Sequence, residues 1–205
     1  MHPKVIGARG WVLVRKLVRE RLTQDWVLAG GTGLALQLGH RLSNDLDFFR
    51  AELFDTEELA SALARVEKVS VQGRSAGTLH VALGGVRISF LTAQRPFLFP
   101  GITYRGLVVA DPRDIAAMKV VAIGERGSRK DFIDLYFFLR GGGSLEFVFQ
   151  LIHRRFRGLD FNEYHLLRSL VFFDDAETEP MPRMLRRVSW PEIKKTLAAE
   201  VRRLS

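Results

Sequence analysis

Residues 28–49 read LAGGTGLALQLGHRLSNDLDFF, and this stretch decides the fold. A short apolar run ends at Gly30-Gly31-Thr32, and apolar residues then follow at helical spacing until Gly39. A second apolar run begins at Leu46. The pattern predicts a buried strand, a glycine turn, a short helix and a second strand.

The glycine turn has the composition of a phosphate-binding loop. Glycine lets the backbone turn sharply and approach a phosphate closely, and the free N–H groups at the start of a helix bind anions. Thr32, directly after Gly30-Gly31, adds a hydroxyl donor. A Gly-Gly-Thr sequence by itself is usually only a turn, so its meaning depends on the residues around it.

Two carboxylates stand at the start of the second strand. Asp45 and Asp47 are two residues apart, and side chains at this spacing in an extended segment point to the same side. Such carboxylates repel each other unless protons or cations neutralise them. Mg²⁺ that bridges the phosphates of a nucleotide would supply this neutralisation. We therefore predict a magnesium–nucleotide site between the glycine turn and this pair.

The segment also resembles a known family. Residues 40–49, HRLSNDLDFF, are similar to the His-Arg-x-Ser-x-Asp-hydrophobic-Asp-Phe signature of the AbiEii/AbiGii-type toxins, within the polymerase-β-like nucleotidyltransferase superfamily. Residues 114–119, DIAAMK, resemble the family's helix with an inward lysine. Residues 126–135, RGSRKDFIDL, resemble its Arg/Lys-Asp-x-x-Asp-Leu helix. The matches together extend over about residues 25–140.

The resemblance implies a role for each matched residue. Asp45 and Asp47 would hold one or two Mg²⁺ ions. Lys119 would pair with the triphosphate and stabilise the charge that develops as pyrophosphate leaves, and Asp131 would be the downstream acidic active-site residue. The residues expected to contact nucleotide or phosphate are Gly30, Gly31, Thr32, Arg41, Ser43 and Lys130.

One position departs from the superfamily pattern. Many polymerase-β-like enzymes carry a third carboxylate on a later strand, and the corresponding strand here, residues 85–91, has Ser89 in that position. Serine cannot accept a proton at neutral pH or replace a carboxylate at magnesium. Either Asp131 supplies the missing carboxylate, or the chain binds nucleotides without efficient transfer.

The order of the elements predicts an α+β protein. Strand patterns at residues 66–71, 79–83 and 86–91 follow the first strand pair, and Gly84-Gly85 indicates a hairpin between the last two. From Asp111-Pro112 onward the patterns are helical. The expected fold is therefore a mixed sheet flanked by helices, with a C-terminal helical part.

These patterns divide the chain into two parts. We expect residues 1–110 to form the nucleotidyltransferase core. Residues 111–205 would form the helical part and contribute Lys119 and Asp131 to the site. Two or three helices are expected after residue 144, with a polar linker near residues 174–182.

Charge and composition restrict the partners and the setting. The formal net charge of +8 favours polyanions such as nucleic acid or nucleotides, although many basic proteins bind none. The chain has no cysteine, which excludes disulfides, zinc–thiolate sites and thiol nucleophiles. No apolar run approaches the ~20 residues that cross a bilayer. A cytoplasmic protein that does not contact a membrane is therefore expected.

Several other features carry weaker signals. Residues 153–157, HRRFR, form a basic cluster that could contact RNA, although a solvated helix face is the better interpretation. Basic residues in the last quarter of the chain fit a tRNA-like substrate without requiring one. His80 and His165 are interpreted as structural, because neither has a partner at metal-ligand spacing.

The leading hypothesis is a magnesium-dependent nucleotidyltransferase that moves a nucleoside monophosphate from a triphosphate to an acceptor hydroxyl. The resemblance implies the toxin of a toxin–antitoxin pair, with tRNA as the acceptor and a cognate antitoxin as a partner. One alternative is a module of the same fold that binds nucleotide or RNA without turnover, which Ser89 motivates. Another is transfer to a protein or a small molecule.

Overall fold

The computed structural model describes residues 1–157 and 162–204, and these contain a seven-stranded mixed sheet. Its strand order is β3-β4-β5-β2-β1-β7-β6. The central strands β1 and β2 are antiparallel, whereas β2–β5 and β1–β7 are parallel pairs. The strands are β1 (Val27–Leu28), β2 (Leu46–Arg50), β3 (Val69–Ser75), β4 (Thr78–Leu83), β5 (Val86–Thr92), β6 (Ile102–Tyr104) and β7 (Leu107–Val109).

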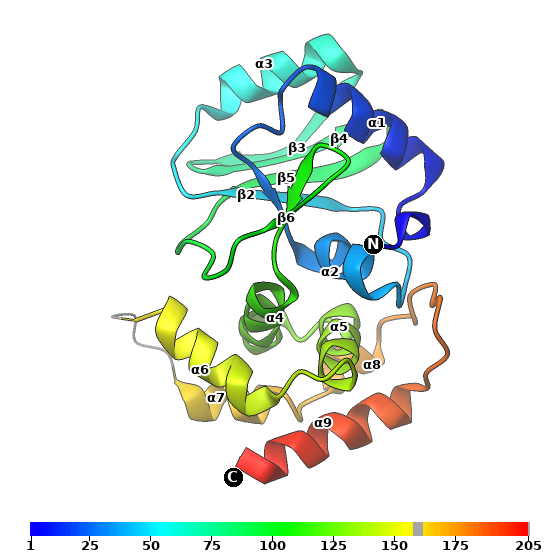
Figure 1. Ribbon diagram of the computed structural model, residues 1–205, viewed down its shortest axis with the longest axis vertical. Helices are drawn as coiled ribbons and strands as arrows, with labels where there is room; N and C mark the ends of the chain where they lie inside the picture. Colours follow the sequence, from blue (N-terminus) through cyan, green and yellow to red (C-terminus); the bar gives the residue numbers. More distant parts are fainter. Residues whose placement is uncertain (158–161, 205) are drawn as a thin grey trace.

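Helices cover both faces of the sheet and continue as a layer of their own. Helices α1 and α3 lie on one face, and α2 lies on the other, between the sheet and α4 and α5 (Figure 1). The helices are α1 (Ala8–Arg19), α2 (Gly30–Leu38), α3 (Thr56–Val66), α4 (Pro112–Arg126), α5 (Arg129–Arg140), α6 (Leu145–Arg155), α7 (Glu163–Ser169), α8 (Asp174–Glu177) and α9 (Trp190–Leu204), with a short 3₁₀ turn η1 (Pro3–Val5) before them.

The expected helix starts are present. The Asp55 side chain accepts hydrogen bonds from the first backbone N–H groups of α3, and Asp111 caps α4 ahead of Pro112 at its first position. The last strand ends at Val109, two residues before this cap. The predicted α+β class, with a mixed sheet and a helical C-terminal part, is confirmed.

Some element boundaries differ from those expected. Val66 is the last residue of α3, so the strand expected at residues 66–71 instead begins at Val69 and runs to Ser75. β6 was not expected, because three residues are too few to show alternation. The expected linker at residues 174–182 begins with the short helix α8.

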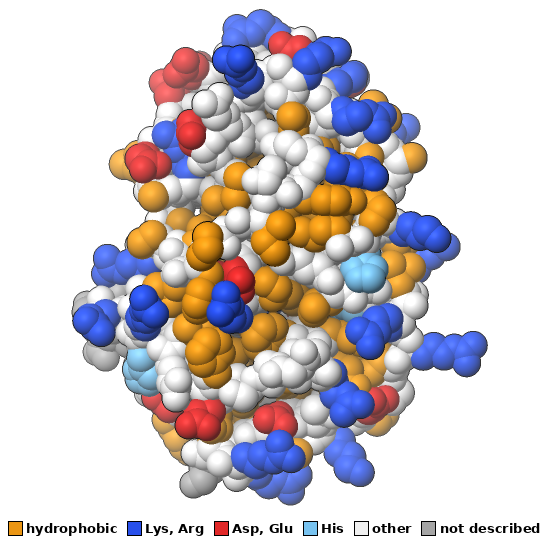
Figure 2. Space-filling model, in the orientation of Figure 1, with side chains coloured by type: hydrophobic (Ala, Val, Ile, Leu, Met, Phe, Trp, Pro, Cys, Tyr) orange, Lys and Arg blue, Asp and Glu red, His pale blue; other side chains and the backbone are white. Residues whose placement is uncertain are grey.

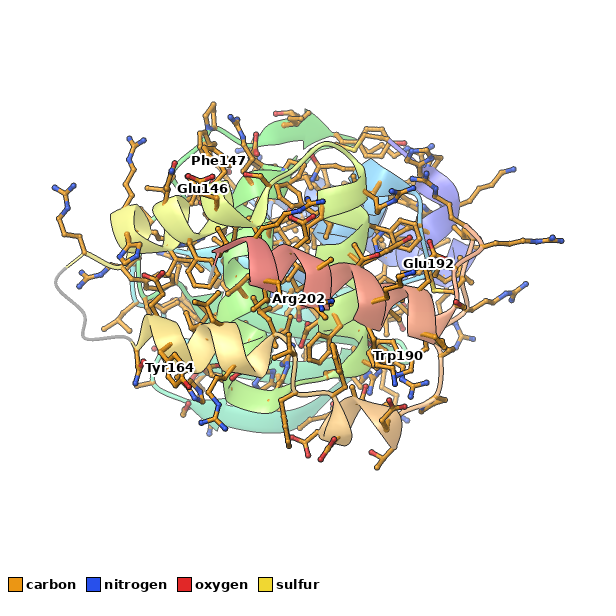
Figure 3. All side chains as sticks on the ribbon, turned by 90° about the horizontal axis from the view of Figure 1, so that it is seen from below. Glu146, Phe147, Tyr164, Trp190, Glu192 and Arg202 are labelled. Atoms are coloured by element: carbon orange, nitrogen blue, oxygen red, sulfur yellow. The ribbon has the colours of Figure 1, made fainter. Side chains whose placement is uncertain are left out.

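Each part has an apolar cluster of its own, and a third, smaller cluster contains Leu34 of α2 and Ile115 of α4. In the sheet part, the rings of Phe48 and Phe90 stack with centroids 5.4 Å apart. In the helical part, Phe132 on α5 packs edge-on against Trp190, the first residue of α9. Figure 3 shows α9 lying across the helical layer, with Trp190 and Glu192 at its start. We propose that the core and helical parts divide between β7 and α4.

Candidate active site

Three adjacent strands place three polar side chains in one row. In the parallel pair β2–β5, Asp47 lies opposite Ser89, and in the antiparallel pair β4–β5, Ser89 lies opposite His80. Residues in direct register on neighbouring strands point to the same face of a sheet. His80 Nδ1 lies 3.0 Å from Ser89 Oγ.

Asp47 faces the glycine turn at close range. Gly30, with φ of +59°, begins α2, and a Cβ at this position would lie 2.5 Å from Asp47 Oδ2. Burial raises the pKa of Asp47, against the lowering effects of the Lys119 charge and the Ser89 hydrogen bond. A carboxylate in this setting gains stability from any cation that replaces its lost hydration.

Asp45 lies nearer to solvent and is held by an ion pair. Arg87 Nε lies 2.9 Å from Asp45 Oδ1, and the second guanidinium nitrogen lies 3.1 Å from Oδ2. Arg87 comes from β5, two residues before Ser89. The bidentate pair places a positive charge beside the Asp45/Asp47 pair.

The Thr32 side chain holds the loop that carries Asp45. Its side chain is buried, and its hydroxyl hydrogen-bonds Ser43 Oγ at 2.7 Å and the backbone carbonyl of Asp45. The hydroxyls of Thr32 and Ser43 thus bond to each other and to the loop, and Ser43 also lines the larger cavity described below. The backbone N–H groups at the start of α2 still lack helical partners and remain suited to an anion.

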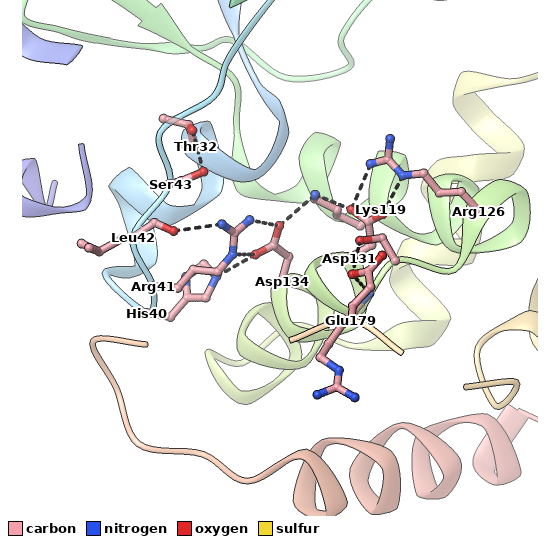
Figure 4. Close-up of polar contacts among 12 residues, drawn as sticks. Thr32, His40, Arg41, Leu42, Ser43, Lys119, Arg126, Asp131, Asp134 and Glu179 are labelled. Carbon is pink, nitrogen blue, oxygen red and sulfur yellow. Dashed lines mark hydrogen bonds and ion pairs between the residues drawn. The ribbon is translucent and has the colours of Figure 1, made fainter. Parts of the chain in front are cut away.

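Lys119 and Asp131 meet beneath the row, on the facing helices α4 and α5. Lys119 Nζ lies 2.7 Å from Asp131 Oδ1 and 2.8 Å from Asp134 Oδ2 (Figure 4). Burial lowers the pKa of Lys119, but the charges of Asp134 and Asp131 outweigh it and keep the lysine protonated. Arg126, at the end of α4, also pairs with Asp131 at 3.0 Å.

Asp134 is the buried centre of a charged network. Arg41 donates two hydrogen bonds to it, of 2.7 and 2.8 Å, and His40 Nε2 lies 2.8 Å from the same carboxylate. Burial would raise the pKa of Asp134, but the charges of Lys119 and Arg41 and these hydrogen bonds hold it well below its usual range. Arg41, which was expected to contact phosphate, is thus buried and ties the α2–β2 loop to α5.

Two adjoining cavities open over these residues. The larger has a volume of about 990 Å³ and reaches the exposed side chains of Lys130 and Arg183. The smaller, of about 500 Å³, extends over apolar side chains that include Met118 and Phe156. The residues that line both cavities are Gly31, Asp47, His80, Ser89, Lys119 and Arg126. The shared wall marks the place where two bound molecules would meet.

The donor set suits a magnesium ion that shares its ligands with a nucleotide. Among residues 1–157 and 162–204, no three His, Cys, Asp or Glu side chains are grouped closely enough to hold a metal ion by themselves. Asp131 therefore does not complete a three-carboxylate group with Asp45 and Asp47. Mg²⁺ is commonly held by one or two carboxylates, with water and substrate phosphates as its other ligands. The two aspartates meet that requirement.

The sequence interpretation missed several residues of the site. Arg87 and Arg126 line the larger cavity as cations, and Glu179 lines it from the segment after α8. Glu179 accepts hydrogen bonds of 2.9 Å from the Ser128 hydroxyl and the Arg129 backbone N–H at the start of α5. Alternation along residues 85–91 could have placed Arg87 on the face of Ser89. No local pattern connects Glu179 with α5.

The structure agrees with some of the weaker sequence interpretations and differs from others. His165 is structural, as expected, because its Nε2 lies 3.0 Å from the Gly124 carbonyl. The basic cluster at residues 153–157 is not a uniformly solvated face, since Arg155 is buried and pairs with Asp114 at 3.2 Å. His80, interpreted as structural, instead lines both cavities.

Comparisons with known proteins identify related sequences and structures. The sequence model of the nucleotidyl transferase AbiEii toxin family (type IV toxin–antitoxin system) matches residues 11–99. An uncharacterized protein of Aquifex aeolicus is 36% identical over 171 residues, which cover 81% of this chain and 82% of that protein.

Solved structures share the fold at low sequence identity. A Helicobacter pylori protein described as a nucleotidyltransferase aligns with a TM-score of 0.59 and 16% identity, over 96% of this chain and 93% of its own. MenT4, a nucleotidyltransferase toxin of Mycobacterium tuberculosis, aligns with a TM-score of 0.57 and 18% identity, over 95% of this chain and 84% of its own.

The mixed sheet, the glycine turn at the start of α2, and the aspartate pair at the start of β2 define a nucleotidyltransferase. The chain belongs to the AbiEii nucleotidyl transferase toxin family. No helix in the described part of the chain is long and apolar enough to span a membrane.

Proposed function

We propose that the protein transfers a nucleoside monophosphate from a nucleoside triphosphate to a hydroxyl of RNA, with tRNA as the acceptor, and depends on Mg²⁺. The observation that carries the proposal is the meeting of Asp47, the free N–H groups of α2 and Lys119 on the wall shared by two cavities. Phosphoryl transfer needs hydrogen-bond donors to the phosphate, a cation, and two substrates held in line. This wall offers a place for each.

Each cavity suits one substrate. The smaller cavity, with apolar side chains from α4 and β5, suits the nucleoside of the triphosphate. Its phosphates would then lie along the shared wall, at the start of α2 and beside Lys119 and Arg126. The larger cavity, with Arg87, Lys130 and Arg183 at its margin, suits the RNA end and its phosphates.

Each residue of the site has its own role in the proposed transfer. Asp45 and Asp47 would hold Mg²⁺, which neutralises charge on the phosphates when it is bound. Lys119 is kept protonated by two carboxylates, so it can stabilise the negative charge on the departing pyrophosphate without moving far. Asp134 and Asp131 hold that lysine in position. Arg87, which pairs with Asp45, lines the larger cavity and would face the phosphates of the acceptor there.

Surface charge supports an RNA acceptor. The formal net charge is +8, and Lys and Arg side chains surround most of the face shown in Figure 2. A polyanion would be attracted to such a surface, and its binding would weaken with salt. Together with the family, this charge supports a role as the toxin of a toxin–antitoxin pair, held by a cognate antitoxin in the cytoplasm.

The acceptor class can be tested directly. Purified protein is incubated with Mg²⁺, each α-labelled nucleoside triphosphate in turn, and total RNA from a bacterial lysate with its proteins retained. Label that ribonuclease removes from a tRNA-sized band supports the proposal and names the base. Label that only protease removes would show a protein acceptor instead. Nucleotide binding without any labelled product would favour a binding module.

A further inference from the structure

We propose that His80 accepts the proton of the attacking hydroxyl, in place of the carboxylate that Ser89 has replaced. The inference rests on the proposed transfer reaction and assigns a residue to its proton step. His80 lies opposite Ser89 in the β4–β5 register, and Ser89 lies opposite Asp47 in the β2–β5 register. The His80 imidazole thus lies one strand beyond Ser89, in the row that begins at Asp47.

The hydrogen bond to Ser89 involves one nitrogen of His80 and leaves the other free. Ser89 Oγ lies 3.0 Å from His80 Nδ1, and in the tautomer with its proton on Nδ1 the ring donates this hydrogen bond to the serine oxygen. In this neutral form of the imidazole, Nε2 carries the lone pair.

The position of His80 allows contact with a substrate. Its side chain is exposed and lines both cavities. No hydrogen bond joins Nε2 to another residue in the described part of the chain.

Three ionisable residues near His80 are already engaged. Lys119 is protonated between two carboxylates, and Asp131 is paired with Lys119 and Arg126. Asp45 is paired with Arg87 and is assigned to the metal. His80 therefore offers a base at the meeting of the two cavities that needs no rearrangement of these pairs.

The step balances as a simple displacement. The acceptor hydroxyl gives its proton to His80 Nε2 as its oxygen forms a bond to the α-phosphorus. The bond between the α-phosphorus and the bridging oxygen breaks, and pyrophosphate leaves with that electron pair. The imidazolium then returns its proton to water. No oxidant, reductant or further reactant is required.

Two substitutions separate proton transfer from positioning. H80A removes the ring, and H80Q keeps an N–H donor for Ser89 but cannot accept a proton at neutral pH. H165A is the matched control, because His165 is exposed and lies against Gly124, outside both cavities. Single-turnover transfer from each α-labelled triphosphate to total tRNA is measured with Mg²⁺, together with nucleotide affinity and Tm.

We expect H80A and H80Q to slow transfer by about 10²-fold or more, with nucleotide affinity and Tm as in wild type. Added imidazole should restore part of the rate of H80A and leave H165A unchanged. Rates of either variant within about threefold of wild type, or a loss that imidazole does not relieve, would overturn the assignment of His80. A wild-type protein that labels no RNA would instead overturn the proposed function, and this inference with it.

Discussion

Asp134 Oδ2 lies 2.8 Å from Lys119 Nζ, so a buried carboxylate of α5 holds the lysine of α4 beneath the aspartate pair. The same carboxylate also binds Arg41 and His40 from the loop that precedes β2. One residue thus joins the two helices that carry Lys119 and Asp131 to the loop that carries Asp45. The active site depends on this network for its shape as well as its charge.

Substitution of Asp134 should therefore be strongly destabilising. D134N leaves Arg41 and Lys119 with less than their full counter-charge in the interior, and the expected loss is about 3–5 kcal/mol. Urea denaturation measures it. E67Q is the control, because the Lys16–Glu67 pair is exposed to solvent and should contribute far less to stability. Equal small losses in both variants would contradict the network's role.

The pH dependence of that loss has a definite sign. The folded-state pKa of Asp134 is held well below its unfolded value of about 3.9, so its contribution is full above the unfolded pKa. It decreases as the pH falls through the folded pKa. The stability difference between wild type and D134N should be constant above about pH 5 and should shrink below about pH 4. A difference that grows in acid would show the opposite linkage.

The Gly30 position should tolerate no side chain. In G30A the Cβ would lie 2.5 Å from Asp47 Oδ2, and the backbone has φ of +59°. G142A is the matched control, because Gly142 also has positive φ but has nothing within 4 Å of the added atom. Both should lose about 1–3 kcal/mol through backbone strain. Only G30A should lose transfer, by about 10²-fold, since displacement of Asp47 misplaces the reacting groups.

The buried charge of Asp47 should lower the stability of the folded protein. Burial raises its pKa, so loss of its charge in D47N should stabilise the metal-free protein at pH 7 by about 0.5–2 kcal/mol. D45N should not be stabilised, because Asp45 is paired with Arg87 near the surface. Thermal unfolding reports both changes. Mg²⁺ with a nucleoside triphosphate should raise the Tm of wild type but not of D47N. A D47N protein less stable than wild type would contradict this reading.

The RNA acceptor can be tested through salt. The exposed cations Lys130 and Arg183 line the larger cavity, whereas Lys195 is exposed on α9, outside it. Removal of each phosphate contact should reduce the slope of log affinity against log salt by about 1. K130A/R183A should therefore lower the slope for tRNA by about 2, and K195A should leave it unchanged. Equal slopes for the two variants would exclude this path for the acceptor.

The sequence predicted the parts of the site that lie on short, regular segments. Asp45 and Asp47 lie two residues apart at the start of β2, and the glycine turn begins one helix, so local spacing was enough to pair them. The position of Lys119 was inferred through the family resemblance. Its burial between two carboxylates also required the packing of α4 on α5.

The remainder depended on pairing between distant segments. His80 joins the site because β4 and β5 pair in a register that sets it opposite Ser89, and register is not visible from either strand alone. Glu179 reaches the start of α5 from about 50 residues away in sequence. The hydrogen bond between Thr32 and Ser43 likewise depends on how α2 packs against the loop before β2.

The central claim is that Asp45 and Asp47 hold the metal for nucleotidyl transfer. The most direct test compares wild type with D45A/D47A in pyrophosphate release and label transfer, with Mg²⁺, each α-labelled triphosphate and total tRNA. We expect label in tRNA and a matching amount of pyrophosphate with wild type. The double variant, still folded by circular dichroism, should lose more than about 10²-fold of both. Undiminished labelling by the double variant would contradict the account.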